Sequence, residues 1–386
     1  MTRRIAILGS TGSIGRSTLD VAAHLGRDCL VCGLSARTSW QTLAEQIRAW
    51  EPHAAAICDE TAADNLRQCI NGRTEVFSGD GALTRLVDAC ECDVVVAAVV
   101  GAAGLPATLA AVEAGKVVAL ANKEALVVAG SLIVPRLAQT GATLLPIDSE
   151  HSAVFQSIHA GRPEEVKRIY LTASGGPFRT WSAEQMAEAT VQDALRHPTW
   201  NMGPKVTIDS ATLMNKALEI IEAKWLFGVD VDRIKVLIHP ESIVHSMVEF
   251  CDGSVVAQLG TPDMRTPIQY ALTYPHRRPG CSRSLDWSSI RRLSFEPPDE
   301  DRFPALRLGY EVARAGGTAG AVMNAANEEA VQAFRDSRIP FGMVVPTVEE
   351  VLRRHVLIEH PSLDELLAAD RWARNEVSRC LEATRT

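Results

Sequence analysis

Short apolar runs and longer stretches of helical spacing alternate along the first 150 residues, and this alternation constrains the fold most strongly. The runs are rich in β-branched and small residues; they begin at residues 5–8 and recur up to residues 142–147. Alternation at such short spacing predicts right-handed βαβ crossovers, which place the strands in a mostly parallel sheet. The remainder carries a hairpin pattern at residues 243–259 and a mainly helical pattern after residue 304.

We therefore expect an α/β protein with three parts: an N-terminal Rossmann-like dinucleotide-binding domain, a central α/β catalytic domain with its own sheet, and a small C-terminal helical domain. The expected boundaries are 1–149, 150–280 and 304–386, with a linker rich in Pro, Ser, Arg and Asp at 281–303. A chain of 386 residues with 46% apolar content is long enough to give each domain a core.

The first expected strand runs directly into the glycine loop GSTGSIG, residues 9–15, and a helical pattern follows. Strand, glycine loop and helix are the context that a dinucleotide fingerprint requires, although the spacing GxxGxxG is a variant of GxGxxG. Without a cofactor, the same loop is a plain tight turn. After the second strand, Arg37, Thr38 and Ser39 stand where an NAD-binding domain carries an acidic residue, which favours the 2′-phosphate of NADP.

Charge and cysteine content exclude several classes of protein. The net charge is −8, from 39 basic and 47 acidic residues, which argues against a nucleic-acid surface. The nine cysteines resemble reduced cytoplasmic thiols, and the pair Cys29 and Cys32 falls inside an expected strand. No targeting signal is seen, and the uncharged stretch 94–112 contains glycines and a proline that favour strand, turn and helix over a membrane span. We expect a cytoplasmic protein without a membrane segment.

The segment 198–222 gathers several kinds of ligand chemistry. Its sequence predicts a Pro/Gly-broken loop, a short β-branched stretch at 206–208, and a periodic helix opened by residues 209–210. On that helix Asn215 and Glu219 project together, with Lys216 about 100° away. A helix start with hydroxyl, amide and ammonium groups suits a phosphate. A surface amphipathic helix with a serine cap explains the segment equally well.

Two carboxylates follow the last strand of the N-terminal region, at Asp148 and Glu150. If the chain is extended there, residues two apart point the same way and present both carboxylates to one point. Together with Glu219 they form an all-oxygen set that selects Mg²⁺ or Mn²⁺ over zinc. The alternative is that these residues only cap a helix and complement its dipole.

Other candidate positions lie at strand ends and in one loop. Asn122, Lys123 and Glu124 follow a strand at the edge where open α/β sheets bind ligands. Ser174 belongs to a Ser-Gly-Gly turn that can face an anion. Trp200 and Met202 lie on a poorly patterned loop at 195–206, which we expect either to cover a ligand as a mobile lid or to bury Trp200 in the core.

The blocks GSTGSIG, ANKE, LLPIDSEH, SGGPF, HPTWNMG and DSATLMNKALEIIEA, in this order and spacing, closely resemble the 1-deoxy-D-xylulose 5-phosphate reductoisomerase family. The resemblance covers essentially the whole chain. It implies that NADPH and Mg²⁺ or Mn²⁺ are the cofactors, that a small phosphorylated sugar is the substrate, and that the sugar is rearranged and then reduced to 2-C-methyl-D-erythritol 4-phosphate in isoprenoid precursor synthesis.

The resemblance also implies roles for individual residues. The NADPH-binding positions are Gly9, Thr11, Gly12, Ser13, Ile14, Arg37, Thr38, Ser39, Asn122, Glu124 and Gly203. The metal ligands are Asp148, Glu150 and Glu219. The substrate-binding positions are Lys123, Ser149, Glu150, Ser174, His197, Trp200, Met202, Ser210, Asn215, Lys216 and Glu219. The catalytic positions are Lys123, Asp148, Glu150, His197 and Glu219. Arg37, Thr38 and Ser39 depart from a common family form of Gly-basic-Asn.

Two other functions compete with this assignment. A metal-independent NADP-dependent dehydrogenase of a phosphorylated small substrate shares the glycine loop but needs no carboxylate set. An NADPH-sensing binding protein needs neither metal nor chemistry. The hairpin at residues 243–259 has an apolar side of the kind often found at a subunit interface, and we expect a homodimer.

Overall fold

The computed structural model describes residues 2–200 and 202–383 and divides into two compact units. Unit 1 comprises Met1–Ala125, Ile133–Ser152 and Asp263–Arg283. Unit 2 comprises Leu126–Leu132, Ala153–Pro262 and Ser284–Thr386. Each unit is assembled from three separate stretches of chain and has its own sheet.

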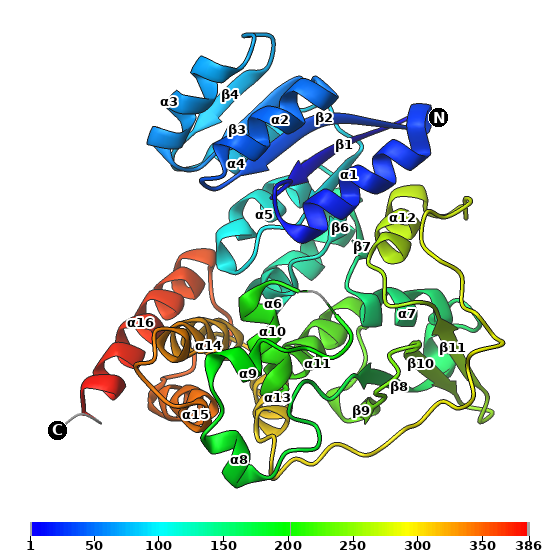
Figure 1. Ribbon diagram of the computed structural model, residues 1–386, viewed down its shortest axis with the longest axis vertical. Coiled ribbons are helices and arrows are strands. Elements are labelled where there is room, and N and C mark those ends of the chain that lie inside the picture. Colours follow the sequence, from blue (N-terminus) through cyan, green and yellow to red (C-terminus); the bar gives the residue numbers. More distant parts are fainter. Residues whose placement is uncertain (1, 201, 384–386) are drawn as a thin grey trace. The chain divides into compact units, whose positions relative to one another are not determined.

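Unit 1 is built on a seven-stranded sheet in the order β4-β3-β2-β1-β5-β6-β7, with every neighbouring pair parallel (Figure 1). Its strands are β1 (Arg3–Leu8), β2 (Cys29–Ala36), β3 (Ala54–Ile57), β4 (Glu75–Ser78), β5 (Val94–Ala97), β6 (Val117–Leu120) and β7 (Thr143–Pro146). Its helices are α1 (Ser13–Leu25), α2 (Trp40–Trp50), α3 (Glu60–Cys69), α4 (Ala82–Ala89), α5 (Leu105–Glu113) and α12 (Arg265–Thr273). The expected parallel sheet is confirmed.

The composition of the central strands explains this arrangement. All four residues of β3 and all four of β5 are buried, as in parallel sheets whose two faces are both covered by helices. Strand order reverses between β1 and β5, so the loop after β1 lies at a topological switch point, where open α/β sheets bind ligands. The uncharged stretch 94–112 folds as β5, a short 3₁₀ turn and α5. Within the described residues, every helix is too short or too polar to cross a membrane.

Unit 2 is built on a four-stranded mixed sheet in the order β11-β10-β8-β9. Its strands are β8 (Val166–Ala173), β9 (Ile234–Ile238), β10 (Val244–Phe250) and β11 (Val255–Leu259). Strands β10 and β11 form the expected antiparallel hairpin, and β8 pairs parallel with β9. Within the segment expected to be a linker, Glu296 forms a β-bridge with Ile238 at the end of β9.

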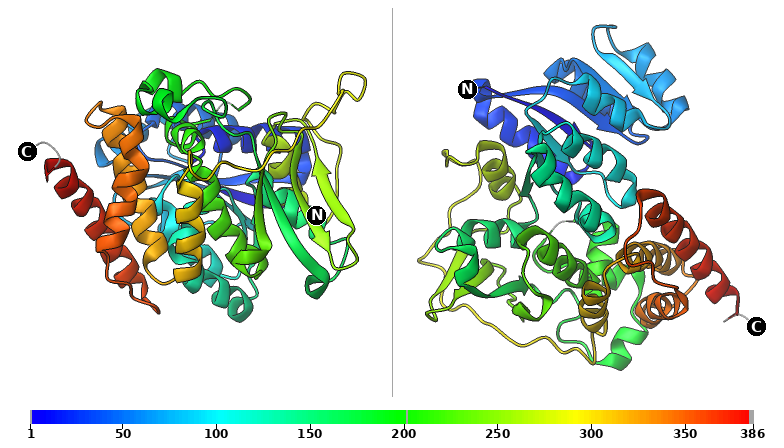
Figure 2. Two further views of the ribbon diagram at one scale, coloured as in Figure 1. Left: turned by 90° about the horizontal axis from the view of Figure 1, so that it is seen from below. Right: turned by 180° about the vertical axis from the view of Figure 1, so that it is seen from behind.

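The helices within unit 2 lie on both sides of the β10–β11 hairpin in the sequence. They are α8 (Ala183–Ala187), α9 (Val191–Ala194), α10 (Pro204–Ala211), α11 (Met214–Phe227), α13 (Ala305–Ala315), α14 (Ala319–Arg335), α15 (Val344–Arg354) and α16 (Leu363–Ala383). Helix α11 packs against α13, and α14 packs against both α15 and α16 (Figure 2). Two further helices, α6 (Lys123–Thr140) and α7 (Ser149–Ile158), contain residues of both units.

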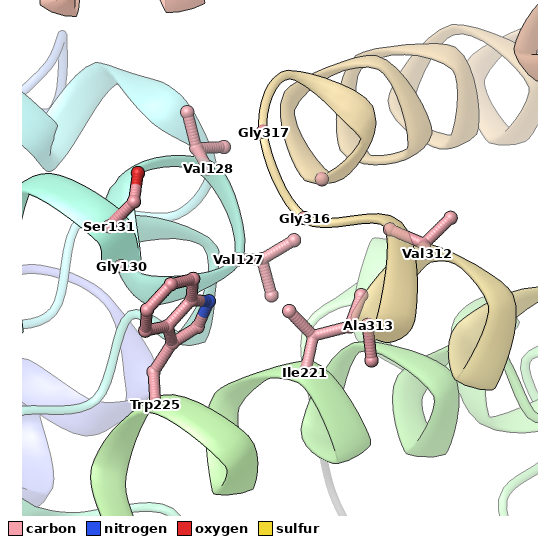
Figure 3. A pocket seen from close by; sticks show the side chains of 11 residues that line it. Val127, Val128, Gly130, Ser131, Ile221, Trp225, Val312, Ala313, Gly316 and Gly317 are labelled. Carbon is pink, nitrogen blue, oxygen red and sulfur yellow. The ribbon is translucent and has the colours of Figure 1, made fainter. Parts of the chain in front are cut away.

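The middle of α6 is packed closely into unit 2. Figure 3 shows the residues that line a small cavity where this segment meets α11, the end of α13 and the start of α14. The volume of this cavity is about 10 Å³. Its walls are mainly apolar and include Val127, Ile221 and Val312. A methyl group added to Gly320 would lie 2.0 Å from the carbonyl oxygen of Val127, so only glycine allows α14 to approach this far.

One local expectation is wrong. The β-branched stretch 206–208, to which no element was assigned, belongs to α10, because Pro204 supplies a first-turn residue suited to a helix start. The helix expected to open at residues 209–210 begins instead at Met214, after α10 has ended. Helices α8, α9 and α12 were not expected either; they are short and carry weak periodicity.

Candidate active site

The glycine loop of unit 1 has the backbone geometry of a phosphate-binding turn. Gly9 has φ +85°, a conformation that side-chain-bearing residues rarely adopt, and an added Cβ would lie 2.7 Å from the carbonyl oxygen of Ala98 after β5. At Gly15 an added Cβ would lie 2.3 Å from the carbonyl oxygen of Gly9. Gly12 is the N-cap of α1, so the first amides of that helix follow the loop directly. The loop is therefore shaped for close approach of a pyrophosphate.

The end of β2 lies beside this loop. The Ser35 hydroxyl accepts a 2.9 Å hydrogen bond from the Gly9 amide, which ties the loop to β2. Beyond the strand, Arg37, Thr38 and Ser39 are all exposed. A guanidinium and two hydroxyls at this place suit a phosphate group better than a ribose diol.

Asn122 and Lys123 begin α6 and are held firmly. The Asn122 side chain caps the helix by accepting a 3.0 Å hydrogen bond from the Ala125 amide, and it donates to the carbonyl oxygens of Val99 and Gly101. Lys123 is buried and forms an ion pair with Asp148. Asn122 thus fixes the loops after β5 and β6, while Lys123 places an ammonium group beside a carboxylate.

Asp148 and Glu150 converge, but not for the reason expected from an extended chain. Helix α7 begins at Ser149, so Glu150 lies in the first helical turn and the alternation argument is wrong. Both side chains nevertheless offer carboxylate oxygens within 4.8 Å of each other, and the Ser149 hydroxyl donates to Glu150. Two carboxylates this close can supply two of the oxygen ligands of a hard divalent cation. The same residues also complement the dipole of α7, so the capping interpretation describes them too.

In unit 2, Ser174 and His197 form a linked pair. The Ser174 hydroxyl follows β8, lies 3.0 Å from Nε2 of His197, and accepts from the Gly176 amide at 3.2 Å. Nδ1 of His197 accepts hydrogen bonds from the amides of Thr199, at 3.1 Å, and Trp200, at 2.8 Å. Burial lowers the pKa of His197 to about 4. The ring is therefore neutral, with its proton on Nε2 facing Ser174.

Helices α10 and α11 meet at a left-handed residue. Leu213 is buried and has φ +57° and ψ +15°, a conformation that costs a non-glycine residue about 1–2 kcal/mol. It turns the chain sharply between the end of α10, which carries Ser210, and the start of α11. Gly176 packs against the last turn of α10, since an added Cβ would lie 2.4 Å from the carbonyl oxygen of Ser210. The Ser174 loop and the end of α10 are thus neighbours.

The first two turns of α11 carry a buried polar cluster. The Asn215 amide donates to Glu219 at 2.5 Å, and the Lys216 ammonium pairs with the same carboxylate. Glu219 is fully buried and Lys216 is 2% exposed. The expected side-by-side arrangement of Asn215 and Glu219 is confirmed. A buried carboxylate held by an amide and an ammonium is a rigid ligand group.

The expected site residues divide between the two units. Unit 1 contains Gly9, Thr11, Gly12, Ser13, Ile14, Arg37, Thr38, Ser39, Asn122, Lys123, Glu124, Asp148, Ser149 and Glu150. Unit 2 contains Ser174, His197, Trp200, Met202, Gly203, Ser210, Asn215, Lys216 and Glu219. Gly203, expected at the cofactor, is thus in a different unit from the glycine loop.

The expected lid at 195–206 is partly helical. Its last three residues belong to α10, and Asn201 lies outside the described residues. Trp200 is half-buried, with its ring centroid 6.1 Å from that of His245, so it is neither a core residue nor a fully exposed one.

Sequence reasoning missed Asp209. This residue is 1% exposed, pairs with Lys205 at 2.8 Å, and accepts a 2.8 Å hydrogen bond from Asn327 of α14. The four-residue spacing of Lys205 and Asp209 was a usable signal once this stretch was taken as a helix. Nothing in the sequence pointed to Asn327.

Comparisons with known proteins match this chain to one family along nearly its whole length. The family model for 1-deoxy-D-xylulose 5-phosphate reductoisomerase matches residues 5–130, and the models of its C-terminal domains match residues 144–227 and 259–376. The 1-deoxy-D-xylulose 5-phosphate reductoisomerase of Pelotomaculum thermopropionicum is 51% identical over 375 residues, covering 97% of each chain. That of Gloeobacter violaceus is 49% identical over 383 residues, covering 98% of each.

Solved structures of the same family share the fold of this chain. The Zymomonas mobilis reductoisomerase in complex with NADPH superposes with a TM-score of 0.93 and 43% identity, covering 99% of this chain and 100% of the other. A reductoisomerase in complex with NADPH, fosmidomycin and magnesium gives a TM-score of 0.93 and 39% identity, covering 100% and 99%.

The parallel sheet with a glycine loop at its switch point, together with a relative solved in complex with NADPH, identifies an NADP-dependent α/β oxidoreductase. The chain belongs to the 1-deoxy-D-xylulose 5-phosphate reductoisomerase family. Its reaction is the NADPH- and divalent-metal-dependent rearrangement and reduction of 1-deoxy-D-xylulose 5-phosphate. The metal-independent dehydrogenase is not favoured, since a relative that covers the whole fold was solved with magnesium.

Proposed function

We propose that this chain performs the family reaction with its substrate phosphate held entirely by unit 2. The observation that supports this assignment is that the loop carrying Ser174 lies against the last turn of α10, which carries Ser210, and that Asn215 and Lys216 follow in the first turn of α11. Two hydroxyls, an amide and an ammonium supply donors for a phosphate without relying on the negative overall charge of the protein. A phosphate bound away from the reacting carbons provides binding energy that orients them.

The metal ligands of the proposal are Asp148, Glu150 and Glu219. The convergence of Asp148 and Glu150 within unit 1 and the rigid, buried Glu219 in unit 2 support it, because all three donors are carboxylate oxygens. Such a set fits Mg²⁺ or Mn²⁺ and does not favour zinc. A bound divalent cation supplies Lewis acidity toward the ketone and hydroxyl oxygens of the sugar.

NADPH is assigned to unit 1. Gly9, Gly12 and Gly15 shape the loop for the pyrophosphate, Thr11, Ser13 and Ile14 line it, and Arg37, Thr38 and Ser39 receive the 2′-phosphate. NADPH supplies the hydride that reduces the branched aldehyde formed by the rearrangement. Asn122 acts by holding the loops after β5 and β6, and Glu124 lies in the first turn of α6. Gly203, which belongs to unit 2, is assigned elsewhere along the cofactor.

The remaining polar groups orient the sugar and stabilise charge. Lys123 places an ammonium group where the substrate oxygens gain negative charge, which lowers the barrier. Ser149 and His197 are assigned to its hydroxyls, and the neutral Nε2–H of His197 is a donor at neutral pH. Trp200 and Met202 cover the bound sugar and exclude water.

Oxidation of NADPH, followed by its absorbance with 1-deoxy-D-xylulose 5-phosphate as substrate, tests the proposal. We expect turnover with Mn²⁺ or Mg²⁺, loss of turnover after EDTA, and recovery when the metal is restored. Turnover undiminished by EDTA would exclude the carboxylate assignment.

We further propose a cytoplasmic homodimer with the domain boundaries expected above. Within the described residues no disulfide joins any of the cysteines, in keeping with a reducing compartment. Strand β11 forms one edge of its sheet, and Val255 on it is 52% exposed, which suits pairing with a second copy. Sedimentation of a monomer at micromolar concentration would contradict the dimer.

A further inference from the structure

A buried ion pair and a long-range hydrogen bond meet at Asp209, in the last turn of α10. One carboxylate oxygen lies 2.8 Å from the Lys205 ammonium, and the other accepts a 2.8 Å hydrogen bond from the side-chain amide of Asn327. Asp209 is 1% exposed, and Asn327, which is 118 residues further along the chain, is fully buried on α14. Burial of a carboxylate is unfavourable unless such partners satisfy it, so this arrangement needs a reason.

The position of Asp209 suggests the reason. It directly precedes Ser210 and lies four residues before Leu213, the left-handed residue that joins α10 to α11. A strained residue of this kind persists only where its surroundings hold the chain on both sides. Beyond the turn, the Leu213 carbonyl accepts from the Ala217 amide, and the Thr212 hydroxyl accepts from the Met214 amide. Before the turn, the bond from Asp209 to Asn327 attaches the last turn of α10 to α14.

We propose that Asn327, acting through Asp209, is a positioning residue for the phosphate seat, and that its amide fixes the direction of the Ser210 hydroxyl. This inference rests on the proposed function, in which Ser210 binds the substrate phosphate. Asn327 itself is assigned no contact with substrate, cofactor or metal. Its bond sets the rotation of the last turn of α10 and thereby the place where Ser210 meets the loop that carries Ser174.

The helix α14 supplies a matched control for this idea. Asn324 lies three residues before Asn327, is also fully buried, and donates its side-chain amide to Glu328 of the same helix at 3.1 Å. Replacing either asparagine by leucine removes the same buried amide group from the same helix and leaves a side chain of similar size. Only Asn327→Leu removes a bond to α10.

Steady-state kinetics of the full-length enzyme separate the two roles. For Asn327→Leu we expect the KM for 1-deoxy-D-xylulose 5-phosphate to rise about tenfold, as when one hydrogen bond to a charged group is lost, with the KM for NADPH unchanged. Asn324→Leu is expected to lower the melting temperature about as much as Asn327→Leu does. It should leave the KM values for both substrates within about twofold of the wild-type values. Equal kinetic effects of the two variants would mean that Asn327 has a packing role only, and the proposal would be wrong.

A double-mutant cycle tests the route through Ser210. In a Ser210→Ala background, Asn327→Leu should raise the substrate KM by less than about twofold, because the hydroxyl that it positions is already gone. A full tenfold rise in that background would overturn the route. Lys216→Ala tests the phosphate site independently. If it leaves the substrate KM unchanged, the proposed function fails; if it raises the KM while Asn327→Leu matches Asn324→Leu, only the present inference fails.

Discussion

The two units hold their functional residues by different means. In unit 1 the cofactor loop is a continuous stretch of seven residues, residues 9–15, whose shape follows from its glycines and from the strand and helix on either side. In unit 2 the groups assigned to the phosphate come from a strand end, the last turn of α10 and the start of α11. A left-handed leucine and a hydrogen bond spanning 118 residues maintain that arrangement.

This difference has a physical consequence. The glycine loop is one continuous stretch, held to β2 by Ser35, whereas the phosphate seat is built from several elements and depends more on the core around it. We expect substitutions in unit 2 to impair chemistry and substrate binding while leaving NADPH binding intact, and substitutions at the end of β2 to do the reverse.

Glu219→Gln should give the largest effect. The substitution keeps the shape of the side chain but removes its charge, both for the proposed cation and for Lys216. We expect turnover to fall about a thousandfold with the dissociation constant for NADPH unchanged, because the cofactor loop belongs to unit 1. Stopped-flow NADPH fluorescence and far-UV circular dichroism check binding and fold. A variant that keeps more than a tenth of wild-type turnover would contradict the assignment of Glu219 to the metal.

The same contrast explains what the sequence could predict. The parallel sheet, the glycine loop and the hairpin of β10 and β11 are all confirmed. They follow from the local spacing of apolar residues, which differs between strands and helices, and from turn residues. The pairing of Asn215 with Glu219 follows from helix geometry alone. These features depend on neighbours in the chain, which a sequence displays directly.

Features that contradict local preference were not predicted. Leucine at a left-handed position opposes the intrinsic preference of the residue, so the break between α10 and α11 was not expected, and the start of the helix was placed at residues 209–210 instead of at Met214. Asp148 and Glu150 were expected to converge along an extended chain, yet they converge across the start of α7. The partnership of Asp209 with Asn327 depends on the packing of α14, for which the sequence near either residue gives no signal.

Arg37→Ala, in the cofactor site of unit 1, should give an intermediate effect. Loss of an exposed guanidinium at the 2′-phosphate should raise the KM for NADPH about tenfold and leave the KM for NADH unchanged. Arg27→Ala is a matched control, because Arg27 is also exposed but lies before β2, at the opposite end of the strand from Arg37. Equal losses with NADPH and NADH would show that Arg37 does not contact the 2′-phosphate.

The pH dependence of stability should give the smallest effect and concerns the loop attached to Ser174. Burial lowers the pKa of His197 to about 4 from its ordinary value of 6.5. Between pH 6.5 and 4 the unfolded chain therefore binds a proton at this residue that the folded chain does not bind, so the free energy of unfolding falls as pH falls through this window.

Because His197 is only half-buried, we expect it to account for about 1 kcal/mol of that fall. His197→Asn retains an oxygen that accepts from the Thr199 and Trp200 amides but does not titrate. Urea unfolding at pH 7 and pH 4.5 should therefore show a smaller loss for the variant than for the wild type. An identical loss in both proteins would mean that the ring is protonated in the folded state, and the hydrogen bonds accepted by Nδ1 would not describe this loop in solution.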